Sequence, residues 1–450
     1  MSDQSIIRIT KELHELKKNS DLSLAVAVQD RDLRNIKALI IGPHDTPYEF
    51  GFFEFSFRFN REYPRKSPAV TCTTTNAGRC RFNPNIYANG KVCLSILGTW
   101  RGESGEEWSA AQGLESILLS IQSLLSSNPY ENEPGFEGAN QEHDKTFQKQ
   151  YVSKIRHETL RISVIQKLEE FCLLTKKEPC ATPSAGCNCH PINQSLANHD
   201  DDEDESNWEP FRDLYKRRFL WYYETYLETI QKEKIRIKDG SGFHRMPFEG
   251  ANNAMDGRFY YNDLEKRLRR IKAFLDAEPE QWEKEGVIAK NQDGTVSVNL
   301  NRQFDQIKEA FKRDDIPHNI ELENGNPFSW VLTYFGRPMT NFDGGMFRIK
   351  MSFSPRFPAE QPRVKFLTNL YHHRVTPDGI LCYIPSTYRS DDVRQHIEAI
   401  FTALEEENPP YDPRTRVHPE AHRLYWGGPE DRKTYNRKLR RSVQRSMEDF

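Results

Sequence analysis

The sequence lacks features that would place it in several large classes of protein. It has no apolar run long enough for a transmembrane helix, its mean hydropathy is clearly negative, and no signal-peptide core follows Met1. It also has no excess of basic charge, because 63 lysines and arginines stand against 66 aspartates and glutamates. We therefore expect no membrane insertion, no secretion leader and no general binding of nucleic acid.

Cysteine is scarce and scattered, with eight residues in a chain of 450. This is not the dense, regular spacing of a disulfide-stabilised secreted domain, so we expect a reducing compartment, the cytoplasm or nucleus. Cys180, Cys187, Cys189 and His190 lie close together and raise the alternative of a zinc-binding regulatory protein. Their spacing matches no standard zinc motif, so we expect incidental cysteines in a linker and no metal site.

Two stretches of the chain follow the same order of patterns. Apolar residues alternate with mainly polar ones over Phe53–Phe59 and again over Phe347–Phe353, which is typical of an antiparallel strand covered on one face. A turn-rich segment precedes each strand, at Gly42–Gly51 and at Gly336–Gly345. Such an ordered series of matches indicates an internal duplication into tandem domains.

Helical periodicity and composition suggest how these domains are joined. Helices are expected over 5–18, over 109–125 with Ser109 and Gln112 as a capping box, and over 147–175 and 301–313. The acidic run at 199–206 predicts a solvated linker. The expected organisation is a domain at 1–165, a helix end and linker at 166–206, a helical extension at 207–285 and a second domain at 295–450.

Cys93 is the residue whose surroundings suggest chemistry. A cysteine between valine and leucine is, by itself, more often a small buried side chain. Here it follows an Asn-Gly turn, and an Asn-Pro-Asn turn upstream ends at Asn85, whose amide could donate to a developing oxyanion. The stretch has no histidine and aspartate set for hydrolysis, which favours thioester transfer between partners over proteolysis.

The order of motifs in the first domain resembles the ubiquitin-conjugating enzyme family. The motifs are HDTPYE, GFFEFSFRFN, YPRKSP, NPN separated by seven residues from CLSIL, and WSAA. Further segments, GTW, IQSL, NPYENEPGFE and IRHETLR, look like the large Z-type members of the family. The sequence departs at Asn83, where the family has a histidine whose role is mainly structural. The second domain carries a more divergent version of the same pattern.

The resemblance implies an α+β fold made of tandem UBC folds, each a four-stranded antiparallel meander with flanking helices. It implies that Cys93 accepts ubiquitin or a ubiquitin-like modifier as a thioester from an activating enzyme. The modifier then passes to lysines of protein substrates, usually with a ligase. No cofactor is implied, because ATP is used by the activating enzyme. Asn85 would support the oxyanion, and Asn132 with Glu131 would help the incoming lysine.

Cys382 holds the matching place in the second domain, but Arg374 stands where the first domain has Asn85. Two interpretations stay open: a second acceptor, or a relic in a domain kept for binding. We expect the domain at 295–450 to be charged weakly or not at all by the enzyme that charges Cys93. A rival of another class is a scaffold that binds ubiquitin or a ligase without catalysis.

Overall fold

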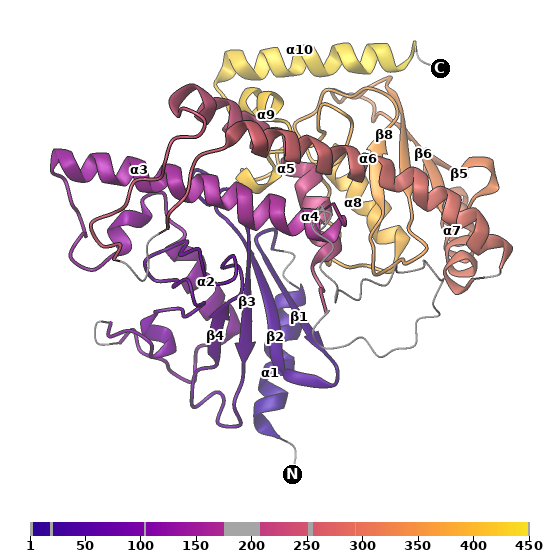
Figure 1. Cartoon of the computed structure of the whole chain (residues 1–450). Helices are drawn as coiled ribbons and strands as arrows, with labels where there is room; N and C mark the ends of the chain where they lie inside the picture. Colours follow the sequence, from indigo (N-terminus) through magenta and orange to yellow (C-terminus); the bar gives the residue numbers. More distant parts are fainter. Residues whose placement is uncertain are drawn as a thin grey trace, which may run out of the picture.

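Two antiparallel sheets organise the molecule (Figure 1). The computed structural model describes residues 3–18, 21–102, 105–174, 208–250, 255–292 and 294–448. Each sheet is a four-stranded meander in chain order. The strands are β1 (Leu24–Gln29), β2 (Asp32–Ile41), β3 (Phe52–Arg58) and β4 (Ala69–Cys72), then β5 (Asn319–Leu322), β6 (Ser329–Phe335), β7 (Met346–Ser352) and β8 (Arg363–Phe366). This confirms the expected α+β fold with two meanders.

The turn before the third strand has the same structure in both sheets. The amide N of Gly42 donates to the carbonyl O of Gly51 at 2.8 Å, and Gly336 donates to Gly345 at the same distance. A Cβ on Gly42 would lie 1.8 Å from the carbonyl O of Tyr48, so only glycine fits the closed turn. The predicted duplication is therefore confirmed at the level of single hydrogen bonds.

Strand β3 corrects one detail of the sequence prediction. Phe53, Phe55 and Phe57 are buried in the core of the first domain, as the alternation indicates. The opposite face is not open to solvent along its whole length, because Phe52 and Glu54 are buried as well. The hydroxyl of Tyr215 donates to the Glu54 carboxylate at 2.6 Å, so a helix from beyond the first domain covers this face.

The helices of the first domain are α1 (Gln4–Lys18), α2 (Leu114–Leu124), α3 (Glu142–Glu158) and α4 (Lys167–Phe171), with the π-helix η3 (Thr159–Gln166) joining α3 to α4. The predicted helix at 109–125 therefore begins only at Leu114. Ser109 and Gln112 form a local turn instead, in which the Ser109 amide N donates to the Gln112 side chain at 2.8 Å. The Leu114 amide N donates to the Glu12 carboxylate at 2.9 Å, so a distant helix caps α2.

Helix α5 (Arg212–Arg236) runs through the middle of the molecule (Figure 1). Trp221, Tyr222 and Tyr223 are all buried, and three consecutive residues cannot share one face of a helix. Both domains therefore pack around α5, which joins one apolar cluster with residues from Leu22 of the first domain to Cys382 and Val417 of the second. The predicted helical extension is thus a central element of the core.

The remaining helices belong to the connection and the second domain. They are α6 (Tyr261–Asn291), α7 (Thr295–Arg313), α8 (Val393–Glu405), α9 (Pro419–Trp426) and α10 (Pro429–Ser446). Polar contacts also join the domains directly. The Tyr388 hydroxyl donates to the Val26 carbonyl O at 3.0 Å, and Arg414 pairs with Asp21 at 2.8 Å and donates to the Ser23 hydroxyl at 3.1 Å. None of the helices that the structure describes is both long and apolar enough to cross a lipid bilayer.

Candidate active site

Cys93 and Asn85 hold each other through two hydrogen bonds. The Cys93 amide N donates to the Asn85 carbonyl O at 2.8 Å, and the Asn85 Nδ2 donates back to the Cys93 carbonyl O at 3.2 Å. The clasp leaves the second hydrogen of the Asn85 amide to interact with a group near the cysteine. Cys93 is 3% exposed, but it is not a member of the three apolar clusters formed by the described residues.

Asn83 builds the turn that presents Asn85. Its buried Nδ2 donates to the Tyr48 hydroxyl at 3.0 Å and to the Leu124 carbonyl O at 2.8 Å. Its Oδ1 accepts from the Asn85 amide N at 2.9 Å. Both ends of this side-chain amide are thus used to fix the backbone, so Asn83 fills a structural position where the family's motif has histidine.

The residues predicted to activate the lysine lie in the 3₁₀ helix η2 (Pro129–Asn132). Asn132 reaches the turn, because its Nδ2 donates to the Leu124 carbonyl O at 3.0 Å and to Asn83 Oδ1 at 3.4 Å. Glu131 is half-buried, and among the described residues no hydrogen bond links its carboxylate to this turn. Asn132 is therefore hydrogen-bonded to the Asn85 turn, whereas the Glu131 carboxylate is not, within the described part of the chain. The proposed roles of Asn132 and Glu131 stay predictions.

Tyr87 is a residue of this site that the sequence analysis missed. Burial and the adjacent Cys93 thiol raise the pKa of Tyr87. Its ring lies 4.8 Å from the Arg81 guanidinium and 5.8 Å from the Lys91 ammonium. Tyr87 is two residues after Asn85, with the buried Ile86 between them. That alternation was a readable signal that both side chains face the cysteine.

Arg81 ties this tyrosine to the rest of the loop. Its buried guanidinium donates to the Pro84 carbonyl O and pairs with Glu133 at 3.1 Å. Arg81 thus contacts both the Tyr87 ring and the Glu133 carboxylate, and it connects this acid to the tyrosine. The site combines a thiol, an amide donor, a phenol and a fixed cation.

Cys382 occupies the same backbone position in the second domain but in different surroundings. Its amide N donates to the Arg374 carbonyl O at 2.8 Å, as Cys93 does to Asn85. Its side chain is 0% exposed and lies in the apolar cluster around α5. Burial raises the pKa of the Cys382 thiol to about 11, which opposes formation of the reactive thiolate.

The upstream turn of the second domain is also fully packed. The Arg374 guanidinium points to Glu406 at 3.4 Å. The ring of His373 stacks on Tyr425 with centroids 3.9 Å apart, and its Nδ1 meets the Tyr435 hydroxyl at 3.1 Å. Arg374 is therefore engaged with Glu406, and His373 is engaged with two tyrosines.

One group of described residues has the composition of a metal site. His44, Asp45 and Glu49 could each offer a ligand atom to one ion. The His44 Nδ1 bonds the Glu49 carboxylate, and its Nε2 lies 3.4 Å from Asp45. Contacts among the three side chains account for this grouping. The cysteines and histidine at 180–190 and the acidic run at 199–206 lie outside the described residues.

The comparisons with known proteins identify the family. Residues 8–159 and 300–439 match the family model described as ubiquitin-conjugating enzyme. The chain belongs to the ubiquitin-conjugating enzyme family. The two matched segments contain Cys93 and Cys382, so both domains are UBC domains.

Relatives within the family show which members this chain resembles. It is 49% identical over 270 residues to ubiquitin-conjugating enzyme E2 Z of Xenopus tropicalis, covering 60% of this chain and 72% of that protein. It is 38% identical over 269 residues to the human E2 Z, covering 60% and 63%. The solved structure of human ubiquitin-conjugating enzyme E2 G1 is 32% identical and covers 28% of this chain and 97% of that one, with a TM-score of 0.25.

The protein is therefore an E2 enzyme, and the Z-type resemblance is confirmed. The alignment with the Xenopus protein is longer than either matched segment, so the similarity does not end with a single UBC domain. Membership of the family implies ubiquitin, an activating enzyme and a ligase as partners in general terms.

Proposed function

We propose that Cys93 carries the modifier as a thioester in this E2 enzyme. In the first step the Cys93 thiolate attacks the thioester carbonyl on the activating enzyme and expels that enzyme's cysteine thiolate. In the second step a substrate lysine amine attacks the Cys93 thioester, loses a proton and expels the Cys93 thiolate. One thioester bond is exchanged for another and then for an amide, so no outside oxidant or cofactor is needed.

The clasp between Cys93 and Asn85 is the observation that carries this proposal. The clasp supports the proposal because it holds an amide donor close to Cys93. In the proposed reaction this amide donates to the thioester carbonyl, where negative charge develops as the amine attacks. The Tyr87 hydroxyl next to the thiol offers a donor to the leaving thiolate. The proposed cargo is ubiquitin or a ubiquitin-like modifier, handled in the cytoplasm or nucleus with protein substrates.

For the second domain we propose a positioning role without a thioester. This is supported by the burial of Cys382 against α5 and by its raised pKa. Ubiquitin's flexible tail could reach that sulfur only if α5 moved away, and α5 also holds the first domain. The second domain has the same fold as the first, but its cysteine is buried. Both facts favour a domain that holds a partner beside Cys93.

A charging assay on the full-length chain tests both parts. The protein is incubated with activating enzyme, ATP and a panel of modifiers, and is then separated with and without a thiol reductant. A reducible adduct should form in the wild type and in Cys382→Ala. Cys93→Ser should give only an adduct that resists reductant, because the serine ester is not a thioester.

The alternative, a scaffold that binds ubiquitin or a ligase without catalysis, makes the opposite prediction. It requires that no modifier in the panel gives a reducible adduct with the wild type. A reducible adduct that persists in Cys93→Ser and disappears in Cys382→Ala would instead assign the acceptor to the second domain.

A further inference from the structure

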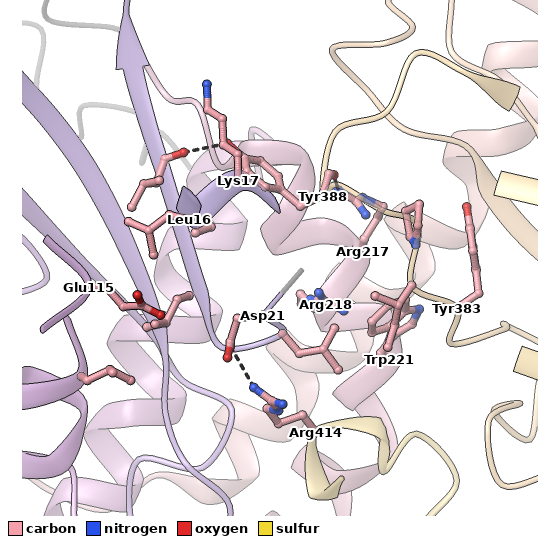
Figure 2. A pocket seen from close by; sticks show the side chains of 17 residues that line it. Leu16, Lys17, Asp21, Glu115, Arg217, Arg218, Trp221, Tyr383, Tyr388 and Arg414 are labelled. Atoms are coloured by element: carbon pink, nitrogen blue, oxygen red, sulfur yellow. Dashed lines mark hydrogen bonds and ion pairs between the residues drawn. The ribbon is translucent and has the colours of Figure 1, made fainter. Parts of the chain in front are cut away.

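A cavity of about 330 Å³ lies where the two UBC domains and α5 meet (Figure 2). The first domain contributes residues of α1, β1 and α2, and the second contributes the segment that follows Cys382. Much of the wall is apolar, including Leu16, Leu22 and Leu24. None of the conjugation chemistry proposed for Cys93 uses this cavity.

Most of the charged and polar side chains of the wall already have partners. Arg414 pairs with Asp21 at 2.8 Å, as the dashed line in Figure 2 shows. Arg217 pairs with Asp213 at 2.8 Å and donates to the Tyr388 carbonyl O at 2.6 Å. These contacts fix the wall and give Arg217 and Arg414 each an acidic partner, and Asp213 also pairs with Arg363.

Arg218 differs from the other charged residues of the wall, because it is buried, whereas Lys17 and Glu115 are exposed. Its side chain is buried, with the residue 5% exposed, and its Nε and Nη1 have no hydrogen-bond partner among the described residues. No ion pair of Arg218 is found in that part of the chain either. The guanidinium lies over the ring of Trp221 at 4.1 Å, and Figure 2 places it between Asp21 and Trp221.

An unmatched buried guanidinium is costly. Arginine stays charged in proteins, so it cannot escape the cost of burial by losing its proton. Burial does lower the pKa of Arg218, which reflects the same unfavourable environment. Buried charges are ordinarily paired, and here the charge lines a cavity that is large enough for a partner.

We propose that this cavity binds a small organic anion whose carboxylate or phosphate group pairs with Arg218. The planar guanidinium fork matches both kinds of acidic group, and the leucines and Trp221 would cover the apolar body of the ligand. One unmatched buried cation favours a ligand with a single acidic group over a polyanion. Because the wall includes both domains, such a ligand would bridge them.

Calorimetric titration of the full-length protein tests the proposal with three probes of similar size. The probes are phenyl phosphate, benzoate and the neutral benzyl alcohol, at constant ionic strength set with chloride. At least one acid should bind at a single saturable site, and the alcohol should not. The tighter of the two acids shows which acidic group the site prefers.

Two variants connect the binding to Arg218. Arg218→Met keeps a long side chain against Trp221 and should weaken the acid by an order of magnitude or more, since hydrogen bonds to a charged group are lost. Arg218→Lys keeps the charge without the fork and should give an intermediate affinity, which also covers the case in which Arg218→Met does not fold. Lys17→Met, which removes an exposed cation at the rim, should change affinity less than twofold.

The proposal fails if neither acid binds saturably, or if the alcohol binds as tightly as the acids. It also fails if Arg218→Met or, where that variant is unfolded, Arg218→Lys binds like the wild type. An equal loss in Lys17→Met would show a diffuse electrostatic effect and would overturn the site as well.

Discussion

Cys93 and Cys382 occupy the same position in the two domains, each donating its amide N to the carbonyl O of the residue that ends the upstream turn, at 2.8 Å. The two cysteines differ in the residues that surround the sulfur. Cys93 lies beside the half-buried Tyr87, whereas Cys382 lies inside the apolar cluster around α5. The same backbone arrangement therefore places a tyrosine hydroxyl near the thiol in the first domain and buries the thiol in the apolar core in the second.

Thiol reactivity should separate the two cysteines. With a pKa of about 11, roughly one Cys382 thiol in a thousand is ionised at pH 8, and burial limits its access further. We expect iodoacetamide to modify Cys93 of the native protein while Cys382 stays largely unmodified, as measured by peptide mass spectrometry. Cys72 is the internal control, because it is 3% exposed, like Cys93, but burial raises its pKa to about 12, so it should stay unmodified in the native protein. All three cysteines should react in urea. Equal native rates for Cys93 and Cys382 would contradict the sealed site.

Asn85 and Asn83 should fail in different ways. Asn85→Ala removes the donor beside the thioester, so charging should be nearly normal while discharge to free lysine falls by about 10²–10³-fold. Asn83→Ala removes the bonds that hold the turn to Tyr48 and Leu124, so both steps should suffer. Single-turnover charging and lysine discharge measure the two steps separately. An equal loss of both steps in Asn85→Ala would mean that Asn85 only supports the loop.

Tyr87→Phe keeps the ring between Arg81 and Lys91 but removes the hydroxyl next to the thiol. The loss of a donor to the thiolate should slow charging several-fold at neutral pH, with the fold unchanged. Tyr130→Phe is a matched control, because that hydroxyl is buried and has no hydrogen-bond partner among the described residues. Wild-type charging rates in Tyr87→Phe would assign Tyr87 to packing alone.

Glu12 should be far more important for stability than its neighbour Glu15 on the same helix. The buried Glu12 carboxylate accepts from the Leu114 amide N at 2.9 Å and from the Tyr63 hydroxyl at 2.7 Å. Glu12→Ala removes a helix cap and a bond from a buried phenol, so it should cost about 2–4 kcal/mol. Glu15→Ala should stay within about 0.5 kcal/mol, because Glu15 is exposed and 3.9 Å from Lys11. Hydrogen exchange of the α2 amides measures the difference, and similar values for both variants would disprove the cap.

Asp213 should make the junction of α5 with the second sheet sensitive to acid. Burial alone would raise its pKa, but Arg363 at 2.9 Å and Arg217 hold the pKa of Asp213 below its usual value of 3.8. Because the folded-state pKa is lowered, the stabilisation is complete above about pH 5 and disappears as the pH falls through the folded-state pKa. Asp213→Asn should therefore cost about 3 kcal/mol at pH 7, because Glu278 at 3.1 Å is then the remaining acidic partner of Arg363 among the described residues, and progressively less below pH 4.

Thermal midpoints at pH 7, 5 and 3.5 check this prediction. The exposed Asp305→Asn is the matched control and should track the wild type at each pH. A difference between Asp213→Asn and wild type that stays constant down to pH 3.5 would show that the ion pair is not its cause.

The sequence was sufficient wherever local chemistry decides structure. The alternation at Phe53–Phe59 predicted β3, the glycines at 42 and 51 predicted the closed turn, and the motif around Cys93 predicted the family. It placed the start of α2 five residues too early, because the cap of that helix is Glu12, about a hundred positions away in the chain. Tyr87 was missed although its alternation with the buried Ile86 was readable, because no local motif connects a tyrosine to the chemistry of Cys93.

The sequence by itself determined the two UBC domains and their cysteines, since strand alternation, turn glycines and short motifs act over a few neighbouring residues. Only the tertiary structure decided which cysteine is sealed and which charge is unmatched. The position of α5 buries Cys382 and brings Arg218 into a cavity between the domains. Burial and charge pairing depend on residues hundreds of positions apart, so they exist only once the chain has packed.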